Sequence, residues 1–329
     1  MPILTPGDVH VNRPLTVIAT GVRQNEDRNF IADKVFPNVG VDKQTDFFYK
    51  MSSAAYLQTN AAKRAPGTET RGVDWTFTKD TYAAEVWGLH HDIEDQFRAN
   101  ADENFQLDRA GTELITAQML LRREKEWYAN FFKTGIWTTD FTGVSGTPTG
   151  NQFKQFDQAG STPIQLFRKA STRFMLRTGI RPNFVVFGPD VWDALLDHAD
   201  IIERVKYTQG GFLTEDLVAR AIGIQNVYTG SAIETTANDE DTAQYPTVGG
   251  FMAGKSMLLG YSAPRAARNV PSAGYTFSWT GYAGANAWGG RVKKFRMEAI
   301  ASDRIEIEAA WGMKIVAPQL GEFYSSVVS

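Results

Sequence analysis

The chain contains no cysteine. Disulfide bonds, cysteine-ligated zinc and thiol catalysis are therefore excluded, and the composition suits a reducing compartment. Histidine is also scarce, with only His10, His90, His91 and His198. Because a glycine–serine nucleophile elbow is absent as well, the sequence gives no ground for a Ser/His/Asp catalytic group.

Long apolar runs and an excess of basic charge are missing too. No run reaches the roughly 18 apolar residues of a membrane span, and the N-terminus lacks the basic start and apolar core of a signal peptide. The 34 basic and 37 acidic residues give a net charge of −3. A protein that grips nucleic acid through phosphate contacts should be basic, so that function is not indicated. With 329 residues, 43% of them hydrophobic, the chain is expected to be soluble and to fold as about two domains.

A long helical pattern dominates what is present. Apolar residues recur at three- and four-residue steps and predict a helix over residues 103–133, about 45 Å long, acting as a strut. Asp102 is the expected N-cap and Gly135 the expected stop. Mixed charge at residues 122–126 is interpreted as a solvated face rather than a nucleic-acid patch. The face expected to be buried comprises Leu107, Ala110, Leu114, Ala117, Leu121, Tyr128 and Phe131.

The segments before this helix read as an arm followed by strands. Residues 1–45 have no sustained periodicity and predict an extended arm that is ordered only when it lies on something, with residues 30–37 as a short anchor. Alternating patterns predict strands near residues 46–51, 73–78 and 82–86. Residues 52–70 contain few large apolar side chains, so we expect a loop that projects from the body. Pro66 and Gly67 predict a tight turn in this loop.

The segments after the helix alternate between helices and strands. Residues 138–160 are expected to be a loop. A helix from Pro163 to Gly179, a buried strand at 183–187 and a short helix between Thr214 and Gly223 indicate an α/β unit over about 161–290. Terminal strands carrying Ile305, Ile307 and Trp311 should pack on the strut.

Three motifs suggest chemistry that their context does not support. Residues 249–256, from Gly249 to Ser256, match the phosphate-binding pattern GxxxxGK[ST], but no buried strand precedes them, and residues 257–259 are expected to form a strand instead of a helix. His90 and His91 are adjacent and do not define a metal geometry, so an interface or strand-end role is favoured. The acidic residues 239–241 lack the pattern of a calcium loop. No metal, no cofactor and no enzymatic activity are expected.

Taken together, several segments in this order resemble the major capsid protein of tailed bacteriophages, with the Hong Kong 97-like fold. The resemblance covers nearly the whole chain, and none of its motifs is catalytic. Its carriers are the predicted strut and the segments FIADKVFP (30–37), RAPGT (64–68), TGIRPN (178–183), GPDVW (188–192) and PSAGYTF (271–277).

This resemblance implies an α+β fold with defined parts. The N-terminal arm would be residues 1–45 and the extended β-hairpin loop residues 46–91. The peripheral domain would combine 92–160 with 291–329 and include the spine helix 103–133, and the axial domain would be 161–290. The loop tip, Lys63, Arg64, Pro66, Gly67 and Thr68, would contact a neighbouring subunit. Lys50 and Lys63 lie where some relatives form cross-links, but nothing local identifies either as reactive.

The implied function is structural. The chain would self-assemble through hexamers and pentamers into an icosahedral shell that encloses double-stranded DNA without sequence-specific binding. Scaffold and portal proteins, and decoration proteins in some relatives, would be its partners. The expected location is the virion capsid, after assembly in the host cytoplasm, with no membrane involved. Two alternatives remain open: an encapsulin-type nanocompartment shell protein, and a P-loop nucleotide hydrolase that uses Gly249 to Ser256.

Overall fold

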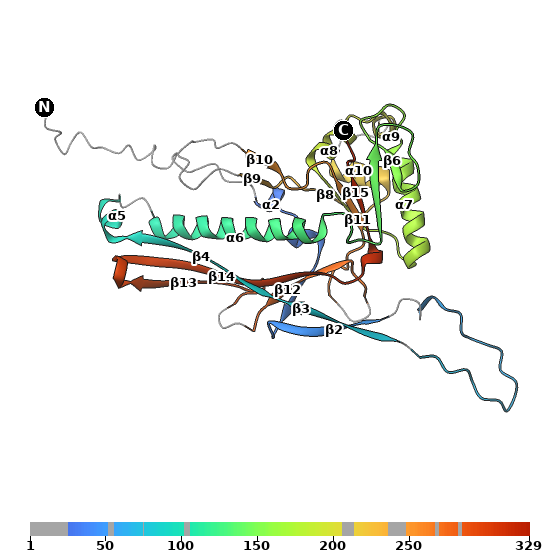
Figure 1. The fold of residues 1–329 in the computed structure, drawn as a ribbon, viewed down its shortest axis with the longest axis horizontal. Helices are drawn as coiled ribbons and strands as arrows, with labels where there is room; N and C mark the ends of the chain where they lie inside the picture. The colour runs from blue at the N-terminus through green and yellow to red at the C-terminus, as the bar shows by residue number, and fades with distance from the viewer. Residues whose placement is uncertain are drawn as a thin grey trace.

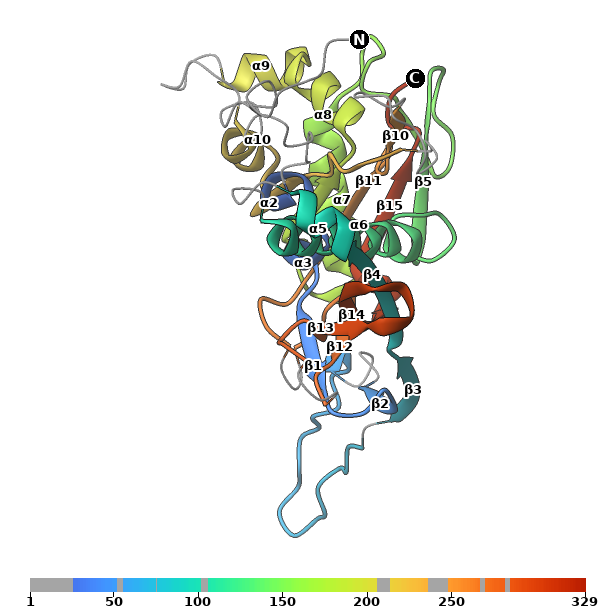
Figure 2. The same cartoon turned by 90° about the vertical axis from the view of Figure 1, so that its left-hand side faces the viewer.

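The computed structural model describes residues 26–51, 56–74, 76–101, 106–205, 214–235, 248–266, 270–281 and 285–329. A long helix lies along an antiparallel sheet, and a compact sheet-and-helix part sits at the C-terminal end of that helix (Figures 1 and 2). A thin hairpin leaves the body on the opposite side from the compact part. In the described part of the chain no helix is long and apolar enough to span a membrane.

The long helix is α6 (Leu107–Phe131). Its 25 residues make it about 37 Å long at 1.5 Å per residue. It begins four residues later and ends two residues earlier than predicted, with Gln106 at the N-cap position. The predicted cap, Asp102, lies outside the described residues. Gly135 follows the helix with φ +81°, a conformation that glycine adopts without steric cost.

The predicted buried face of α6 is right at Tyr128 and Phe131 and wrong along the N-terminal half of the helix. Leu114 is 50% exposed, whereas Ile115 and Met119 are buried. The buried positions follow the i, i+4 row of the helix, which crosses the sheet beneath it. Gly111 begins this row. The helix packs so closely on the sheet there that a Cβ at this position would lie only 2.7 Å from the ring of His91. The buried residues of α6 are Gly111, Ile115, Met119, Arg123, Glu124, Trp127, Tyr128 and Phe131.

The sheet under α6 has five strands. The central strand β14 (Ser302–Ile315) pairs with β4 (Glu85–Glu94) along one edge, and with β13 (Gly290–Met297) and β12 (Gly274–Trp279) along the other. β1 (Asn38–Val41) adds a parallel edge strand next to β12. Ile305, Ile307 and Trp311 of β14 are buried in one cluster with Ile115 and Met119 of α6. The prediction that the terminal strands pack on the strut is confirmed.

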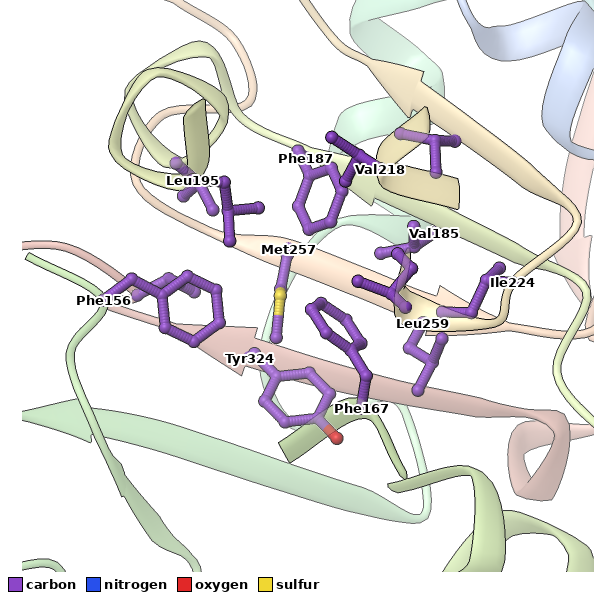
Figure 3. Close-up of a cluster of buried hydrophobic side chains, with 14 of the residues drawn as sticks. Phe156, Phe167, Val185, Phe187, Leu195, Val218, Ile224, Met257, Leu259 and Tyr324 are labelled. Carbon is purple, nitrogen blue, oxygen red and sulfur yellow. The ribbon is translucent and has the colours of Figure 1, made fainter. Parts of the chain in front are cut away.

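The compact part is built on a six-stranded sheet. Its order is β6 (Gln152–Lys154), β5 (Thr139–Val144), β15 (Gly321–Ser325), β11 (Met257–Gly260), β7 (Phe184–Phe187) and β8 (Asn226–Thr229). One face packs on the helices α7 (Pro163–Thr178), α8 (Pro189–Leu196), α9 (Ala199–Val205) and α10 (Glu215–Ile222), as Figure 3 shows for Phe167, Phe187 and Leu195. The other face, including Val186 and Leu258, packs on the C-terminal half of α6. All four residues of β7 are buried, as expected for a strand covered on both faces.

Helix boundaries in this part follow the predicted signals. α7 begins at Pro163 and ends before Gly179, which has φ +74°, and α10 ends before Gly223, also at φ +74°. Thr214 occupies the N-cap position of α10, but its side chain makes no capping hydrogen bond.

A buried ion pair connects α7 to β15. The carboxylate of fully buried Glu322 accepts a hydrogen bond from Arg173 at 2.6 Å and another from the hydroxyl of Tyr324 at 2.9 Å.

The N-terminal described segment lies against α6 and the compact part. It contains the short helices α2 (Glu26–Asn29) and α3 (Ala32–Val35). Ile31, Val35 and Phe36 are at most 2% exposed, and the Phe36 ring is 4.6 Å from that of Phe131. The predicted anchor at 30–37 is therefore confirmed.

Several sequence-based boundaries differ from the observed strands. Residues 138–160, predicted to be a loop, contain β5 and β6. The strand predicted at 73–78 begins only at Phe77, in β3 (Phe77–Ala83). The predicted peripheral and axial ranges interleave in both sheets, because β15 pairs with the axial strand β11 and brings β5 and β6 into the same sheet, while the axial strand β12 pairs with β14. Pairing between segments far apart in sequence decides which sheet a strand joins, and local patterns do not reveal it.

The remaining short elements are the antiparallel pair β9 (Ile233–Thr235) and β10 (Val248–Phe251), helix α5 (Asp95–Asn100), and the 3-10 turns η2 (Glu298–Ile300) and η3 (Pro318–Leu320).

Candidate assembly surface

The loop predicted to project does so. It connects β2 (Thr45–Met51) to β3, which pair from Thr45↔Ala83 to Met51↔Phe77. From residue 56 to residue 74 every position is exposed except Asn60, which is partly exposed. In Figure 1 this segment extends away from the sheets and helices of the body. An ordered ribbon with no core of its own is suited to lie on another surface.

The tip of the loop is a tight turn. The Thr68 amide donates to the Ala65 carbonyl at 3.2 Å, Pro66 and Gly67 occupy the two central positions, and Gly67 has φ +80°. This combination is typical of a type II turn, in which proline presets φ and glycine accepts a positive value. The Arg64 Nε atom donates to the Thr68 carbonyl. The predicted turn is confirmed, and Lys63 stands exposed beside it.

The ribbon at the base of the loop has two different faces. The inner face packs on the five-stranded sheet: the Tyr82 ring stacks on Phe277 at 4.6 Å between centroids, and Phe48 lies 5.7 Å from the same ring. Gly312 allows a close approach at this point, because a Cβ there would lie 2.0 Å from the Ala83 carbonyl oxygen. The ribbon is therefore fixed to the body while the loop beyond it extends outward.

The outer face of the ribbon carries an aromatic row. Phe47, Tyr49 and Phe77 are 49%, 57% and 45% exposed, and Tyr49 contacts both phenylalanines edge to face. The Lys79 Nζ atom lies 5.0 Å from the centre of the Phe47 ring. Sequence reasoning found the strand and missed this surface. The signal was three consecutive aromatic residues, Phe47, Phe48 and Tyr49, which place apolar side chains on both faces of a strand.

Lys50 is held by an ion-pair group at the base of the ribbon. Asp80 binds Lys50 and accepts from Lys314 at 2.8 Å. Although burial opposes its ionisation, hydrogen bonds from Lys314 and Lys50 lower the pKa of Asp80 to about 2. Asp80 is therefore ionised at neutral pH, and the Lys50 amine forms an ion pair with it. This agrees with the sequence, in which nothing around Lys50 marks it as a reactive lysine.

The phosphate-binding motif does not have the geometry that its chemistry needs. Gly249 lies in β10, and the residues after Ser256 form β11 instead of a helix. The Lys255 amine binds the main-chain oxygen of Ser329, and the Lys255 carbonyl accepts from the Val327 amide at 2.8 Å. A phosphate site requires free amide groups at a helix N-terminus. The predicted strand at 257–259 is confirmed, and the nucleotide hydrolase hypothesis has no structural support.

The described histidines lie apart from any group of potential metal ligands. His90 and His91 lie in β4, and within the described residues no three His, Cys, Asp or Glu side chains gather as a metal group. The acidic residues 239–241 lie outside the described residues.

A Ser–His contact that the sequence did not reveal joins Ser161 to His198, with 2.7 Å between Oγ and Nε2. The Asp200 amide donates to Nδ1 at 3.1 Å. The neutral ring therefore carries its proton on Nε2 and donates to Ser161, whose hydroxyl donates to the Phe156 carbonyl. A catalytic base must accept the serine proton, so this contact is structural.

Known structures share this arrangement of elements. A phage-related protein from Bordetella bronchiseptica is 20% identical, with a TM-score of 0.66 over 96% of this chain and 97% of that one. The capsid of cyanophage P-SCSP1u is 11% identical, with a TM-score of 0.58 over 93% and 90%. An encapsulin from Synechococcus elongatus is also 11% identical, with a TM-score of 0.52 over 97% and 96%. The chain thus has the Hong Kong 97-like capsid fold, and the predicted α+β class is confirmed.

A sequence relative with an assigned role distinguishes among the proteins that share this fold. The major capsid protein of Burkholderia phage BcepMu is 26% identical over 241 residues, which are 70% of this chain and 71% of the relative. No protein-family model matches the chain. The predicted resemblance to phage major capsid proteins is confirmed, and the chain is a structural capsid protein rather than an enzyme.

Proposed function

We propose that copies of this chain form the icosahedral shell around the double-stranded DNA of a tailed phage, through hexamers and pentamers. The projecting hairpin carries this proposal, because an exposed ribbon without a core is costly to order unless another surface covers it. The net charge of −3 supports a container that does not bind DNA tightly. The virion is the location that follows, with assembly in the host cytoplasm.

The loop tip and the aromatic row are the proposed contacts between subunits. Lys63, Arg64 and the turn at Pro66, Gly67 and Thr68 would meet acidic groups on a neighbour. The row of Phe47, Tyr49 and Phe77 would be covered at the same time, since the tip and the row belong to the same hairpin. Scaffold, portal and decoration proteins are proposed partners in the same assembly.

We also propose a division of the chain that follows the sheets. An arm precedes β2, and the hairpin loop runs from β2 to the end of β3. A peripheral part combines β4, α6, β13 and β14, and an axial part contains the six-stranded sheet with α7 to α10. This division moves β5, β6 and β15 from the predicted peripheral range to the axial part.

Electron microscopy of negatively stained protein tests the shell. Purified full-length chain, with its scaffold where one is encoded beside it, should form closed particles or capsomers above a threshold concentration. A stable monomer or lone dimer at high concentration, with scaffold present, would contradict the proposal. The similarity to an encapsulin favours a second candidate, a nanocompartment shell, which would yield particles without DNA and without tails in the native host.

A further inference from the structure

The outer side of α7 ends in a group of exposed apolar side chains. Leu176 is 88% exposed, and Met175 beside it is exposed as well. Leu57 of the projecting loop is also exposed and lies just past this end of the helix, 3.6 Å from the position that a Cβ of Gly179 would take. Figure 1 shows α7 at the outer side of the compact part. Apolar side chains that gather on one surface mark a contact with another molecule, whereas single ones do not.

The same side of α7 is basic nearer its N-terminus. Arg168 and Lys169 are exposed, and neither forms an ion pair with another described residue. About two turns of helix separate them from the apolar end, which places all four side chains on one side; we call these four the α7 face. Arg173 and Arg177 instead bind buried Glu322. Since α7 contains no acidic residue, a partner for this face needs acidic charge together with apolar surface.

The helices α8 and α9 carry such a surface on the same chain. Asp190, Asp193 and Asp197 recur at steps of three and four residues along α8 and its C-terminal end, so they lie on one side of the helix. All three are exposed, and none forms an ion pair with another described residue. Ile202 of α9, which packs against α8, is exposed too. We call these four residues the acidic surface.

We propose that the α7 face of one copy binds the acidic surface of the next copy. Within one copy α9 packs against both α7 and α8, and no ion pair between described residues joins the two surfaces. The contact uses two different surfaces of the same chain, so it is head-to-tail and can repeat around a ring. The inference rests on the proposed shell function, because hexamers and pentamers are rings of this kind.

Charge and apolar contact have separate roles in this interface. Single ion pairs at a protein surface contribute little affinity, but complementary charges fix the orientation of a contact and disfavour wrong partners. Affinity would come from covering the apolar side chains at the end of the α7 face and Ile202. The loop tip, with Lys63 and Arg64, is a poorer partner for the acidic surface, because residues 61–70 contain no large apolar side chain and would leave Ile202 uncovered.

Cysteine cross-linking tests the contact, because the chain contains no cysteine of its own. Full-length Lys169→Cys, Asp193→Cys and the combined variant are treated with a short bismaleimide under assembly conditions. The combined variant should give a ladder of linked copies beyond the dimer. An equimolar mixture of the single variants should give dimers, and each single variant alone should stay unlinked. Equal linking within one single variant, or only dimers from the combined variant, would overturn the head-to-tail contact.

Negative-stain microscopy of the same samples separates this inference from the shell proposal. Particles without a ladder would overturn the contact and leave the shell standing. A ladder without closed particles, with scaffold present, would support the contact and count against the shell, and the absence of both would remove both. If Asp193→Cys links to Lys63→Cys instead of Lys169→Cys, the loop tip occupies the acidic surface and the proposal is wrong.

A charge swap gives an independent test. Arg168→Glu with Lys169→Glu places like charges across the contact, as does Asp193→Lys with Asp197→Lys, so each pair should lower the particle yield about tenfold or more. Combining the two pairs makes the surfaces complementary again and should restore the yield. A combined variant that assembles no better than either pair would contradict the contact.

The control for the swap changes net charge by the same amount elsewhere. Lys133→Glu with Arg220→Glu alters two exposed basic residues outside both surfaces and should leave the particle yield unchanged. An equal loss of yield in this control would show that the swap acts through net charge, which would overturn the proposal. Melting temperatures of the free subunits verify that each variant is folded, and the cross-linking result decides alone where a swap variant is not.

Discussion

Removing the projecting loop should separate folding from assembly. In the variant, residues 52–76 are replaced by the dipeptide Asn-Gly, which connects Met51 to Phe77. Met51 and Phe77 are already paired across the β2–β3 ladder, and Asn-Gly suits the two-residue turn that such a ladder needs. Among the described loop residues the large apolar side chains Tyr56, Leu57 and Val73 are 59%, 59% and 65% exposed, so their removal costs little buried surface.

The free energy of unfolding should rise or stay constant. Loop closure costs about (3/2)RT ln n, so shortening the 25-residue connection to two residues favours the folded state by about 2 kcal/mol. The loss of the surface that Tyr56, Leu57 and Val73 still bury offsets about 1 kcal/mol of this. We expect a melting temperature equal to that of the wild type or a few °C higher, with no shells.

Two measurements on the same preparation decide the outcome. Calorimetry gives the melting temperature of the free subunit, and light scattering with negative-stain microscopy gives the particle yield. A variant with residues 61–70 replaced by Gly and Ser, at unchanged length, controls for chain length: it should melt like the wild type and assemble poorly. If the shortened subunit forms normal particles, or does not fold, the loop is not the contact between subunits that we propose.

Three further substitutions test separate parts of the structure. Lys255→Ala removes only an exposed contact with the Ser329 main chain, so shells should form normally; micromolar ATP binding by the wild type that this variant loses would reverse our interpretation. Arg64→Glu should weaken shells more at low salt than at high salt, because ions screen the repulsion that it introduces; equal yields across salt concentrations would argue against an acidic partner. Glu322→Gln leaves Arg173 without its buried partner and should cost about 3 kcal/mol in urea unfolding. Exposed Glu203→Gln is the matched control, expected within about 0.5 kcal/mol of the wild type, and an equally small effect at Glu322 would show that the buried network is not stabilising.

The elements that the sequence predicted well are those with local signals. α7 lies between Pro163 and Gly179, and α10 ends at Gly223, because proline and glycine impose backbone angles wherever they occur. The turn at Pro66 and Gly67 followed from the same reasoning. Alternation in β14 was visible because one face is buried under α6 and the other carries paired charges.

Elements that depend on distant partners were not predictable in this way. β5 and β15 pair in parallel although nearly two hundred residues separate them, with Phe323 opposite Asp140. Nothing within residues 138–160 distinguishes a strand that will find such a partner from a Gly- and Thr-rich loop. The aromatic row at Phe47, Tyr49 and Phe77 was missed for a related reason, since exposure of a strand face is decided by what packs on the opposite face.

The charged run on α6 shows most clearly why burial cannot be read from residue type. Arg122 and Glu126 form the expected i, i+4 ion pair on the surface, at 2.5 Å. Arg123 and Glu124 lie between them and are buried, because a helix turns about 100° per residue and places neighbours on different faces. The partners that stabilise their charges are the amides of Ile31 and Ala32 and the carboxylate of Asp33, about ninety residues earlier in the chain. A segment predicted as an anchor from its apolar residues is thus also held by the two charged side chains that the helical pattern had assigned to solvent.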